Sequence, residues 1–176
     1  MLKGHEYADW VAEYIVANYA ERDIEVYREI SIGKSIIGKN RRIDVLVICH
    51  KSNHALALEC KFQGSKGTVD EKIPYALQDI AAMQMDSYLV YSGTGFSNGV
   101  IHLLQSSELA CNATPFDLED TADYQQYEGT RELDHILAMR FGWWDLLVAN
   151  KQPVKIVKKP KFKQGYLFSL QPYSVE

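Results

Sequence analysis

The sequence has no apolar run that approaches the ~20 residues needed by a membrane-spanning helix. Its first residues, Met1 to Glu6, are polar and lead into a helical pattern, unlike a signal peptide. It also lacks internal repeats and low-complexity linkers. The three cysteines, Cys49, Cys60 and Cys111, show no metal-ligand spacing, so we expect reduced thiols. These absences favour a cytoplasmic protein with no membrane partner.

The length of 176 residues suits one domain with a sizeable core, and we expect a single domain over 1–176. With 47% apolar and 24% charged residues, the composition is that of an ordinary globular protein. The patterned part runs from about 5 to 111. Residues 112–176 form a C-terminal extension with a helical and a basic part.

Charge is distributed unevenly along the chain. Residues 1–150 hold 13 basic and 22 acidic side chains, a net −9, whereas residues 151–176 hold six lysines and Glu176, a net +5. An acidic body with a basic tail does not resemble a non-specific nucleic-acid coat. It is compatible with a local phosphate-binding element.

Hydrophobic periodicity predicts an alternation of helices and strands. Helices are expected at 5–20, 70–85, 97–111 and 133–148, and strands at 24–32, 41–50, 55–62 and 86–91. The order is helix, three strands, helix, strand, helix, which implies an α/β fold whose mixed sheet has helices on both faces. The helix between the third and fourth strands is a crossover, so those two strands should run parallel.

Three charged residues lie at the ends of two apolar strand segments. Asp44 begins the first segment, and Glu59 and Lys61 lie in the second, after a polar turn at 51–53. Side chains two apart on a strand share a face, so Glu59 and Lys61 should point the same way, roughly 6.6 Å apart along the chain. Charged residues are rarely buried unless they are paired or functional, and a divalent metal would explain these.

Mg²⁺ prefers oxygen ligands and takes one or two carboxylates. Asp44 and Glu59 are candidate ligands, and the main-chain carbonyl of Cys60 is a candidate third oxygen. Lys61 beside such an ion would orient or deprotonate a water, or neutralise charge on a phosphoryl group. This combination suits phosphodiester hydrolysis. The alternative is a surface hairpin with a Glu59–Lys61 ion pair and a capping Asp44.

Asp44, the triplet Glu59-Cys60-Lys61 and the α-β-β-β-α-β order resemble the PD-(D/E)xK nuclease superfamily, which has the restriction-endonuclease-like fold. The resemblance covers residues from about 5 to 95, and Ile43 stands where the name-giving proline would be. It implies a metal-binding aspartate on the second strand and the acid-x-lysine on the third. It also implies a supporting glutamate on the first helix, and Glu6 and Glu13 are both candidates for this position.

The resemblance implies a Mg²⁺-dependent endodeoxyribonuclease, with Mn²⁺ able to substitute, in restriction, repair or phage processing. DNA is the expected partner, with RNA left open, and a homodimer is compatible with the chain. Two rivals remain: a non-cleaving module for nucleic-acid binding or assembly, and a metal-independent adaptor that binds protein through Trp143-Trp144.

Further polar residues could serve the same site. Gln63 follows Lys61 on the same strand face and could hold the attacking water or a phosphate oxygen. Gln78 could face the site from the next helix. A solvated placement is the alternative for both. Candidate phosphate-binding residues are Arg41, Arg42, Lys72, Lys155, Lys158, Lys159 and Lys161. A solvated turn or surface is an alternative for the first three, and a positively charged edge strand for the tail lysines.

Overall fold

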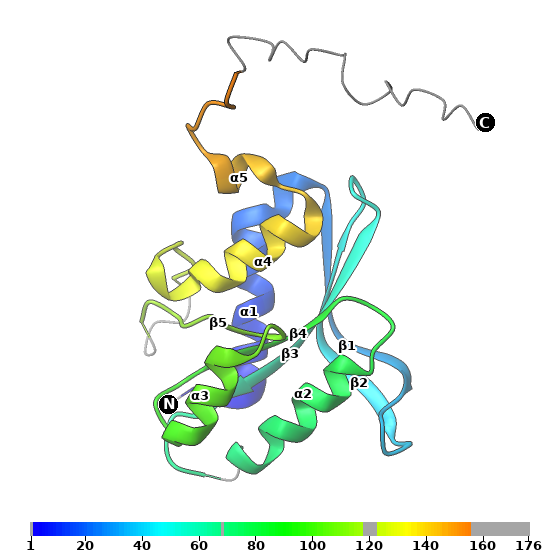
Figure 1. Cartoon of the computed structure of the whole chain (residues 1–176). Helices are drawn as coiled ribbons and strands as arrows, with labels where there is room; N and C mark the ends of the chain where they lie inside the picture. The colour runs from blue at the N-terminus through cyan, green and yellow to red at the C-terminus, as the bar shows by residue number, and fades with distance from the viewer. Residues whose placement is uncertain (1, 68, 118–122, 156–176) are drawn as a thin grey trace, which may run out of the picture.

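A computed structural model describes residues 2–67, 69–117 and 123–155 (Figure 1). The helices are α1 (Gly4–Tyr19), α2 (Ile73–Ala81), α3 (Asn98–Ser106), α4 (Arg131–Phe141) and α5 (Trp144–Val148). The strands are β1 (Ile24–Lys34), β2 (Asn40–Cys49), β3 (His54–Phe62), β4 (Ser87–Ser92) and β5 (Ala110–Asn112). Short 3₁₀ turns occupy Ala20–Arg22, Asp70–Lys72 and Glu128–Thr130.

The strands form one mixed sheet in the order β1-β2-β3-β4-β5. Strands β1, β2 and β3 pair antiparallel, whereas β3 pairs parallel with β4 and β4 parallel with β5. The expected crossover between the third and fourth strands is therefore confirmed. The fold is α/β, as the element order predicts.

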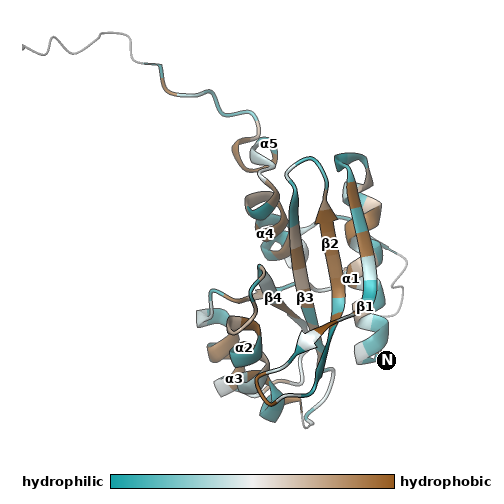
Figure 2. Ribbon diagram, turned by 90° about the vertical axis from the view of Figure 1, so that its right-hand side faces the viewer, coloured by the Kyte–Doolittle hydropathy of each residue, from teal (hydrophilic) through white to brown (hydrophobic). Residues whose placement is uncertain are grey.

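Helices cover both faces of the sheet. Helices α1 and α4 pack on one face, where Val45, Val47 and Leu58 belong to the larger apolar core. Helices α2 and α3 pack on the other face, against Leu89 and Tyr91 of β4. In Figure 2 α1 is seen on one side of the strands and α2 and α3 on the other, and β2 is largely apolar. Because successive strand residues point to opposite faces of the sheet, a single strand contributes side chains to both apolar cores.

Three helix predictions differ from the structure at their ends. The helix expected over 97–111 ends at Ser106, because Ser107 is extended, and its last residues form β5 beside β4. The helix expected over 133–148 is broken at Gly142, whose φ of +70° ends α4. As a result Trp143 is buried while Trp144 is exposed. The helix expected over 70–85 begins as a 3₁₀ turn, and α2 itself spans only Ile73–Ala81, with Pro74 in its first turn as expected.

The C-terminal extension is only partly described. Residues 151–155 have no regular secondary structure, and Lys155 is exposed. The predicted contacts of Lys158, Lys159 and Lys161 lie outside the described residues. None of the helices in the described part of the chain is long and apolar enough to cross a membrane.

The loop after β3 packs backbone to backbone on the loop after β4. A Cβ added to Gly95 would lie 2.3 Å from the carbonyl oxygen of Ser65, and one on Gly93 would lie 2.2 Å from that of Gln63. The amide of Gly95 also donates to the Gln63 carbonyl at 2.7 Å. Only glycine allows such an approach, so these glycines fix the path of the chain directly beyond Lys61.

We expect Gly95→Ala to lower the free energy of unfolding by about 1–3 kcal/mol, because its methyl group meets rigid backbone. The matched control is Gly99→Ala in α3, where an added Cβ meets nothing within 4 Å. It should be neutral or stabilise by up to about 1 kcal/mol through helix propensity. Urea unfolding of both variants measures the difference, and equal stabilities would contradict the tight loop packing.

Candidate active site

The sheet opens between β2 and β3 at one end. The β2–β3 pairing runs from Cys49↔His54 to Val45↔Leu58 and stops there. Beyond this point β2 continues along β1 to Asn40, and β3 continues along β4 to Phe62. The two strands therefore separate just where Asp44 and Glu59 follow in the chain.

Asp44 bridges this opening with its side chain. Its Oδ2 accepts a hydrogen bond of 2.8 Å from the backbone amide of Cys60, which lies between Glu59 and Lys61. The Asp44 carboxylate thus accepts the hydrogen bond that a backbone carbonyl of β2 would accept if the β2–β3 pairing continued. The bond sets Asp44 beside the acid-x-lysine triplet of the neighbouring strand.

The main chain of Asp44 is held from the other side by Arg28. The pairing of β1 with β2 skips Glu29, which would lie opposite Asp44 and has a left-handed φ of +57°. Arg28 of β1 donates from Nη1 to the Asp44 carbonyl, and its Nε donates to Asp9 of α1 at 2.9 Å. A side chain therefore replaces the missing backbone partner, and strain at Glu29 is concentrated next to Asp44.

Glu59 and Lys61 point to the α2 face and form an ion pair. Burial raises the pKa of Glu59; Lys61 opposes this shift, and the nearby Asp44 carboxylate adds to it. Burial alone would lower the pKa of Lys61, but the Glu59 carboxylate outweighs it, so the pKa of Lys61 is raised. Two carboxylates close together repel each other, and one lysine neutralises only one of their charges. A bound cation would therefore stabilise the site.

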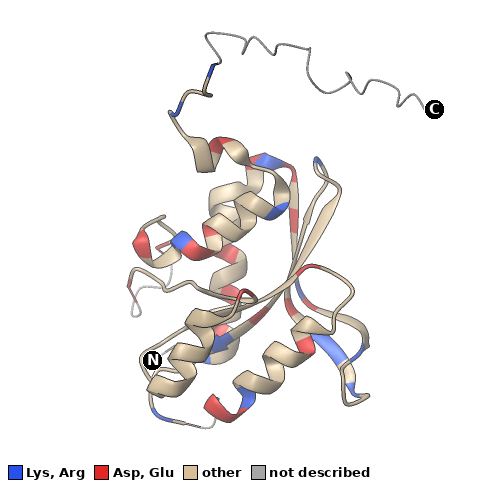
Figure 3. Cartoon of the chain, viewed as in Figure 1, with Lys and Arg blue, Asp and Glu red and all other residues tan. Residues whose placement is uncertain are grey.

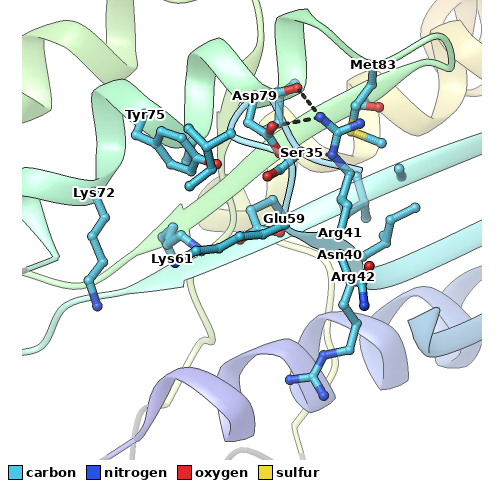
Figure 4. Close-up of a pocket in the computed structure, with 18 residues that line it drawn as sticks. Ser35, Asn40, Arg41, Arg42, Glu59, Lys61, Lys72, Tyr75, Asp79 and Met83 are labelled. Atoms are coloured by element: carbon cyan, nitrogen blue, oxygen red, sulfur yellow. Dashed lines mark hydrogen bonds and ion pairs between the residues drawn. The ribbon is translucent and has the colours of Figure 1, made fainter. Parts of the chain in front are cut away.

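A cavity of about 350 Å³ lies in the opening, between the sheet and α2 (Figure 4). Glu59 and Lys61 lie on one wall, and Tyr75 and Asp79 of α2 on the opposite one (Figure 4). The basic side chains that line it are Lys39, Arg41, Arg42, Lys61 and Lys72, against the two acids Glu59 and Asp79. In an acidic body this is a local excess of positive charge, and the basic start of β2 is seen beside α2 in Figure 3.

Arg41 is tied to Asp79 across the cavity. Its Nε and Nη2 donate to the two carboxylate oxygens at 2.9 and 2.7 Å, and the side chains are only 13% and 16% exposed. Asp79 also accepts from the amide of Ile36, in the turn between β1 and β2, at 2.8 Å. The Arg41–Asp79 pair therefore connects that turn to α2. The Arg41 guanidinium, a predicted phosphate-binding group, is bonded to Asp79 in this structure.

The other predicted phosphate-binding residues of the body are more accessible. Arg42 is exposed, lies 3.4 Å from Glu29, and points away from Arg41 (Figure 4). Lys72 is exposed and lines the cavity at the start of α2. Lys155 is exposed and is not among the residues that line the cavity.

Gln63 and Gln78 lie outside the cavity lining. The Nε2 of Gln63 donates to Asp70 at 3.0 Å and to the Gly95 carbonyl at 2.8 Å, so the buried side chain braces the loop beyond β3. Its Oε1 is buried with no hydrogen-bond partner among the described residues. Gln78 is exposed on α2, next to Asp79, which does line the cavity.

The two first-helix glutamates have other partners. Glu6 caps the start of α1, where its Oε2 accepts from the Lys3 amide at 2.7 Å. Glu13 is exposed and accepts from the hydroxyl of Tyr124. The α1 acid linked to Asp44 in this structure is Asp9, through Arg28.

Two residues of the site, Arg28 and Asp79, were not predicted, although the sequence carries a signal for each. Arg28 follows Ile24 and Val26 at the inward-facing positions of β1, so it is a charged residue where an apolar one is expected. Asp79 lies three residues after buried Ala76 and next to buried Ile80, on the inner side of α2. A charge on an apolar face of an element marks both residues.

The donors present fit a hard divalent cation. Asp44 and Glu59 supply carboxylate oxygens, and Cys60 supplies a main-chain carbonyl, while its thiol lies in the core on the α1 face, where burial raises its pKa. Within the described residues, no three His, Cys, Asp or Glu side chains cluster as a metal site. Two carboxylates and a carbonyl suit Mg²⁺, which keeps waters and substrate oxygens as its other ligands.

A family model of the PD-(D/E)XK nuclease superfamily domain matches residues 3–144, and the chain belongs to this superfamily. The fold and the nuclease-type class expected from the sequence are thereby confirmed. Members of this superfamily generally use divalent metal ions. No significant match was found among curated proteins.

Several solved structures are similar over part of the chain. A repair endonuclease from Pyrococcus abyssi is 16% identical, with a TM-score of 0.35 over 58% of this chain and 44% of that one. A complex of EndoMS with double-stranded DNA is 18% identical, with a TM-score of 0.37 over 62% and 44%. A protein of unknown function is 13% identical, with a TM-score of 0.37 over 56% and 53%. The chain spans about half the length of these structures.

Removing the Asp79 carboxylate should destabilise the fold in a pH-dependent way. The Arg41 guanidinium holds the pKa of Asp79 below its ordinary value. This stability is therefore present above the unfolded pKa of about 3.9 and is lost as pH falls through the lower folded pKa. We expect Asp79→Asn to cost about 2 kcal/mol at neutral pH, with the gap to wild type narrowing in acid.

The matched control for this prediction is Asp145→Asn. Asp145 accepts two hydrogen bonds from Arg22, at 3.1 and 2.7 Å, but its side chain is 67% exposed. Solvent screens such a pair, so its loss should cost less than about 1 kcal/mol. Chemical unfolding of both variants across pH measures the costs. Equal losses would show that the Arg41–Asp79 pair does not fasten the β1–β2 turn.

Proposed function

We propose that this protein is a metal-dependent endonuclease that hydrolyses phosphodiester bonds of DNA. One observation carries the proposal: Asp44 reaches across the opened sheet to the amide of Cys60, beside Glu59 and Lys61. The same opening is lined by five basic side chains, whereas the body around it is acidic. Glu59, one of the two carboxylates proposed to bind the metal, thus lines the same cavity as these cations, and Asp44 lies beside it, bonded to the Cys60 amide.

Asp44, Glu59 and the Cys60 carbonyl are the proposed ligands of Mg²⁺, for which Mn²⁺ would substitute. A bound divalent ion lowers the pKa of a coordinated water and stabilises negative charge on the phosphoryl group. The raised pKa of Glu59 has a consequence for loading: the ion must compete with a proton for this carboxylate, so metal affinity should rise with pH.

Lys61 is proposed to act on the phosphoryl group. Its raised pKa keeps the ammonium charged at neutral pH, because Glu59 lies beside it. In that form it donates hydrogen bonds and neutralises charge that develops on a phosphoryl oxygen, or orients the attacking water. A group that acts mainly on the transition state contributes to cleavage more than to binding.

Two substitutions separate metal binding from catalysis. Lys61→Ala should lower cleavage at least about 100-fold while DNA affinity is largely kept. Asp44→Asn keeps an acceptor for the Cys60 amide but removes a charged ligand, so both metal-induced stabilisation and cleavage should be lost. Plasmid nicking with Mg²⁺, Mn²⁺ or EDTA and thermal melting with Mg²⁺ measure these effects.

Lys51→Ala is the control for Lys61→Ala, since Lys51 is exposed in the turn at the opposite end of the β2–β3 hairpin. It should cut DNA like wild type. Undiminished cleavage in EDTA would contradict the metal requirement. DNA binding without cleavage of any substrate, in wild type as in the variants, would instead favour a non-cleaving module.

The basic side chains of the cavity should contribute to affinity through phosphates. Arg42→Ala and Lys72→Ala remove two of the three exposed lining cations that lie outside the catalytic triplet; the third is Lys39. Each should reduce the slope of log affinity against log salt by up to about 0.9 on duplex DNA. Titrations at several salt concentrations measure this, with Lys51→Ala again as control.

The tail lysines are tested in the same titrations. Lys155 and the lysines at 158, 159 and 161 are proposed as further phosphate contacts, so a chain that ends at Gln152 should bind DNA with a smaller slope. If the slope of the folded truncation is unchanged while the Arg42 and Lys72 variants alter it, phosphate binding is confined to the cavity.

A further inference from the structure

The cavity extends well beyond the catalytic triplet. From Glu59 and Lys61 it continues to the turn between β1 and β2 and to Met83 at the end of α2. Its volume of about 350 Å³ falls in the range of small-molecule pockets, about 300–1,000 Å³. A metal ion and a phosphate would occupy only the part beside the triplet, and the remainder has room for another group.

The far part of the cavity is shaped for a flat, amphipathic group. Ile37, Ile43, Ile80 and Met83 supply apolar walls. Nearer the triplet, the ring of Tyr75, itself partly exposed, lies on the α2 side above the strand that carries Lys61, so it borders this part of the cavity from the side of the triplet (Figure 4). Aromatic and apolar side chains of this kind stack on nucleobases.

Polar groups in the same part of the cavity are suited to a base edge. Ser35 lines the cavity, and its Oγ is buried with no hydrogen-bond partner within the described chain. A buried hydroxyl without a partner is unfavourable, and a ligand that bonds to it would recover this cost. The Arg41–Asp79 pair adds a fixed donor and acceptor array on the same wall.

The β1–β2 turn presents an apolar tip beside the cavity. Ile36 and Ile37 are 46% and 59% exposed, and Lys34 and Lys39 flank them. Two adjacent exposed isoleucines between lysines suit a wedge that enters a stack of bases while cations hold the phosphates. Asp79 fixes the turn through the Ile36 amide, so the wedge is held in place before DNA arrives.

We propose that the cavity receives an unstacked nucleobase from the strand being cut, and that Ile36 and Ile37 fill the gap left in the stack. This inference rests on the proposed nuclease function and narrows its substrate class to DNA with an unpaired nucleotide. Extruding a base from paired duplex costs free energy because it breaks pairing and stacking, and it costs least where the base is already unpaired. The site therefore selects mismatches, small loops and strand junctions over continuous duplex.

The test uses the full chain with Ca²⁺, which should support binding with little cleavage, and duplexes that carry a single 2-aminopurine. In one duplex 2-aminopurine is unpaired as a one-nucleotide bulge, and in the other it is paired. We expect fluorescence of the bulged base to change on binding as it leaves the stack and enters the cavity, and affinity for the bulged duplex to be about tenfold higher or more. Cleavage with Mg²⁺ should show the same preference.

Two variants link the signal to the cavity and the wedge. Met83→Trp fills the cavity, and Ile37→Ser removes an exposed apolar side chain that forms the tip of the turn and also lines the cavity, outside the core. Both should lose the fluorescence change and the preference for bulged DNA. Met139→Trp, at an exposed position of α4, is the control for the larger ring and should keep both. If Met83→Trp fails to fold, the result for Ile37→Ser alone decides whether the base-binding proposal holds.

The outcomes separate this inference from the proposed function. If the protein cuts DNA in Mg²⁺ but binds and cuts bulged and paired duplexes equally, with no fluorescence change, the base-binding cavity is wrong and the nuclease function stands. If bulged DNA is preferred but Ile37→Ser and Met83→Trp retain the preference, the inference is also overturned. If no DNA is bound or cut, the proposed function fails first.

Discussion

The hydrogen bond from the Cys60 amide to the Asp44 carboxylate is the constraint on which the site depends. A sheet that simply continued would pair β2 with β3 through backbone atoms and leave no room for chemistry. Here the pairing stops at Val45 and Leu58, and one side chain spans the gap. The backbone amide is satisfied, and the acid is brought to the acid-x-lysine strand by the same contact.

Each neighbouring element stabilises the opening from a different side. Arg28 holds the main chain of Asp44 where the β1 pairing is interrupted, and Asp9 orients Arg28 from α1. On the opposite face, Asp79 of α2 binds Arg41 and the Ile36 amide, so the β1–β2 turn stays over the cavity. Charged groups on three sides thus hold open a cleft that apolar packing alone would close.

Most helices and strands and the acid-x-lysine triplet were predictable from the sequence, because apolar residues in the core recur with clear helical or strand periodicity. Alternation in β2 and β3 places Glu59 and Lys61 on one face, and the crossover through α2 fixes parallel pairing with β4. The contacts of Arg28 and Asp79 join segments far apart in the chain, so spacing alone does not show them. The strand β5 was missed because three residues are too few for a period, and Gly142 ended a helix whose apolar pattern continued.

The most direct test is anomalous diffraction from crystals of the protein soaked with Mn²⁺. A single ion should lie within about 2.3 Å of a carboxylate oxygen of Asp44, a carboxylate oxygen of Glu59 and the carbonyl oxygen of Cys60. The Lys61 ammonium should then be released from Glu59 and face the cavity. An anomalous peak elsewhere, or none at a concentration that supports cleavage, would contradict the assignment of this opening as the metal centre.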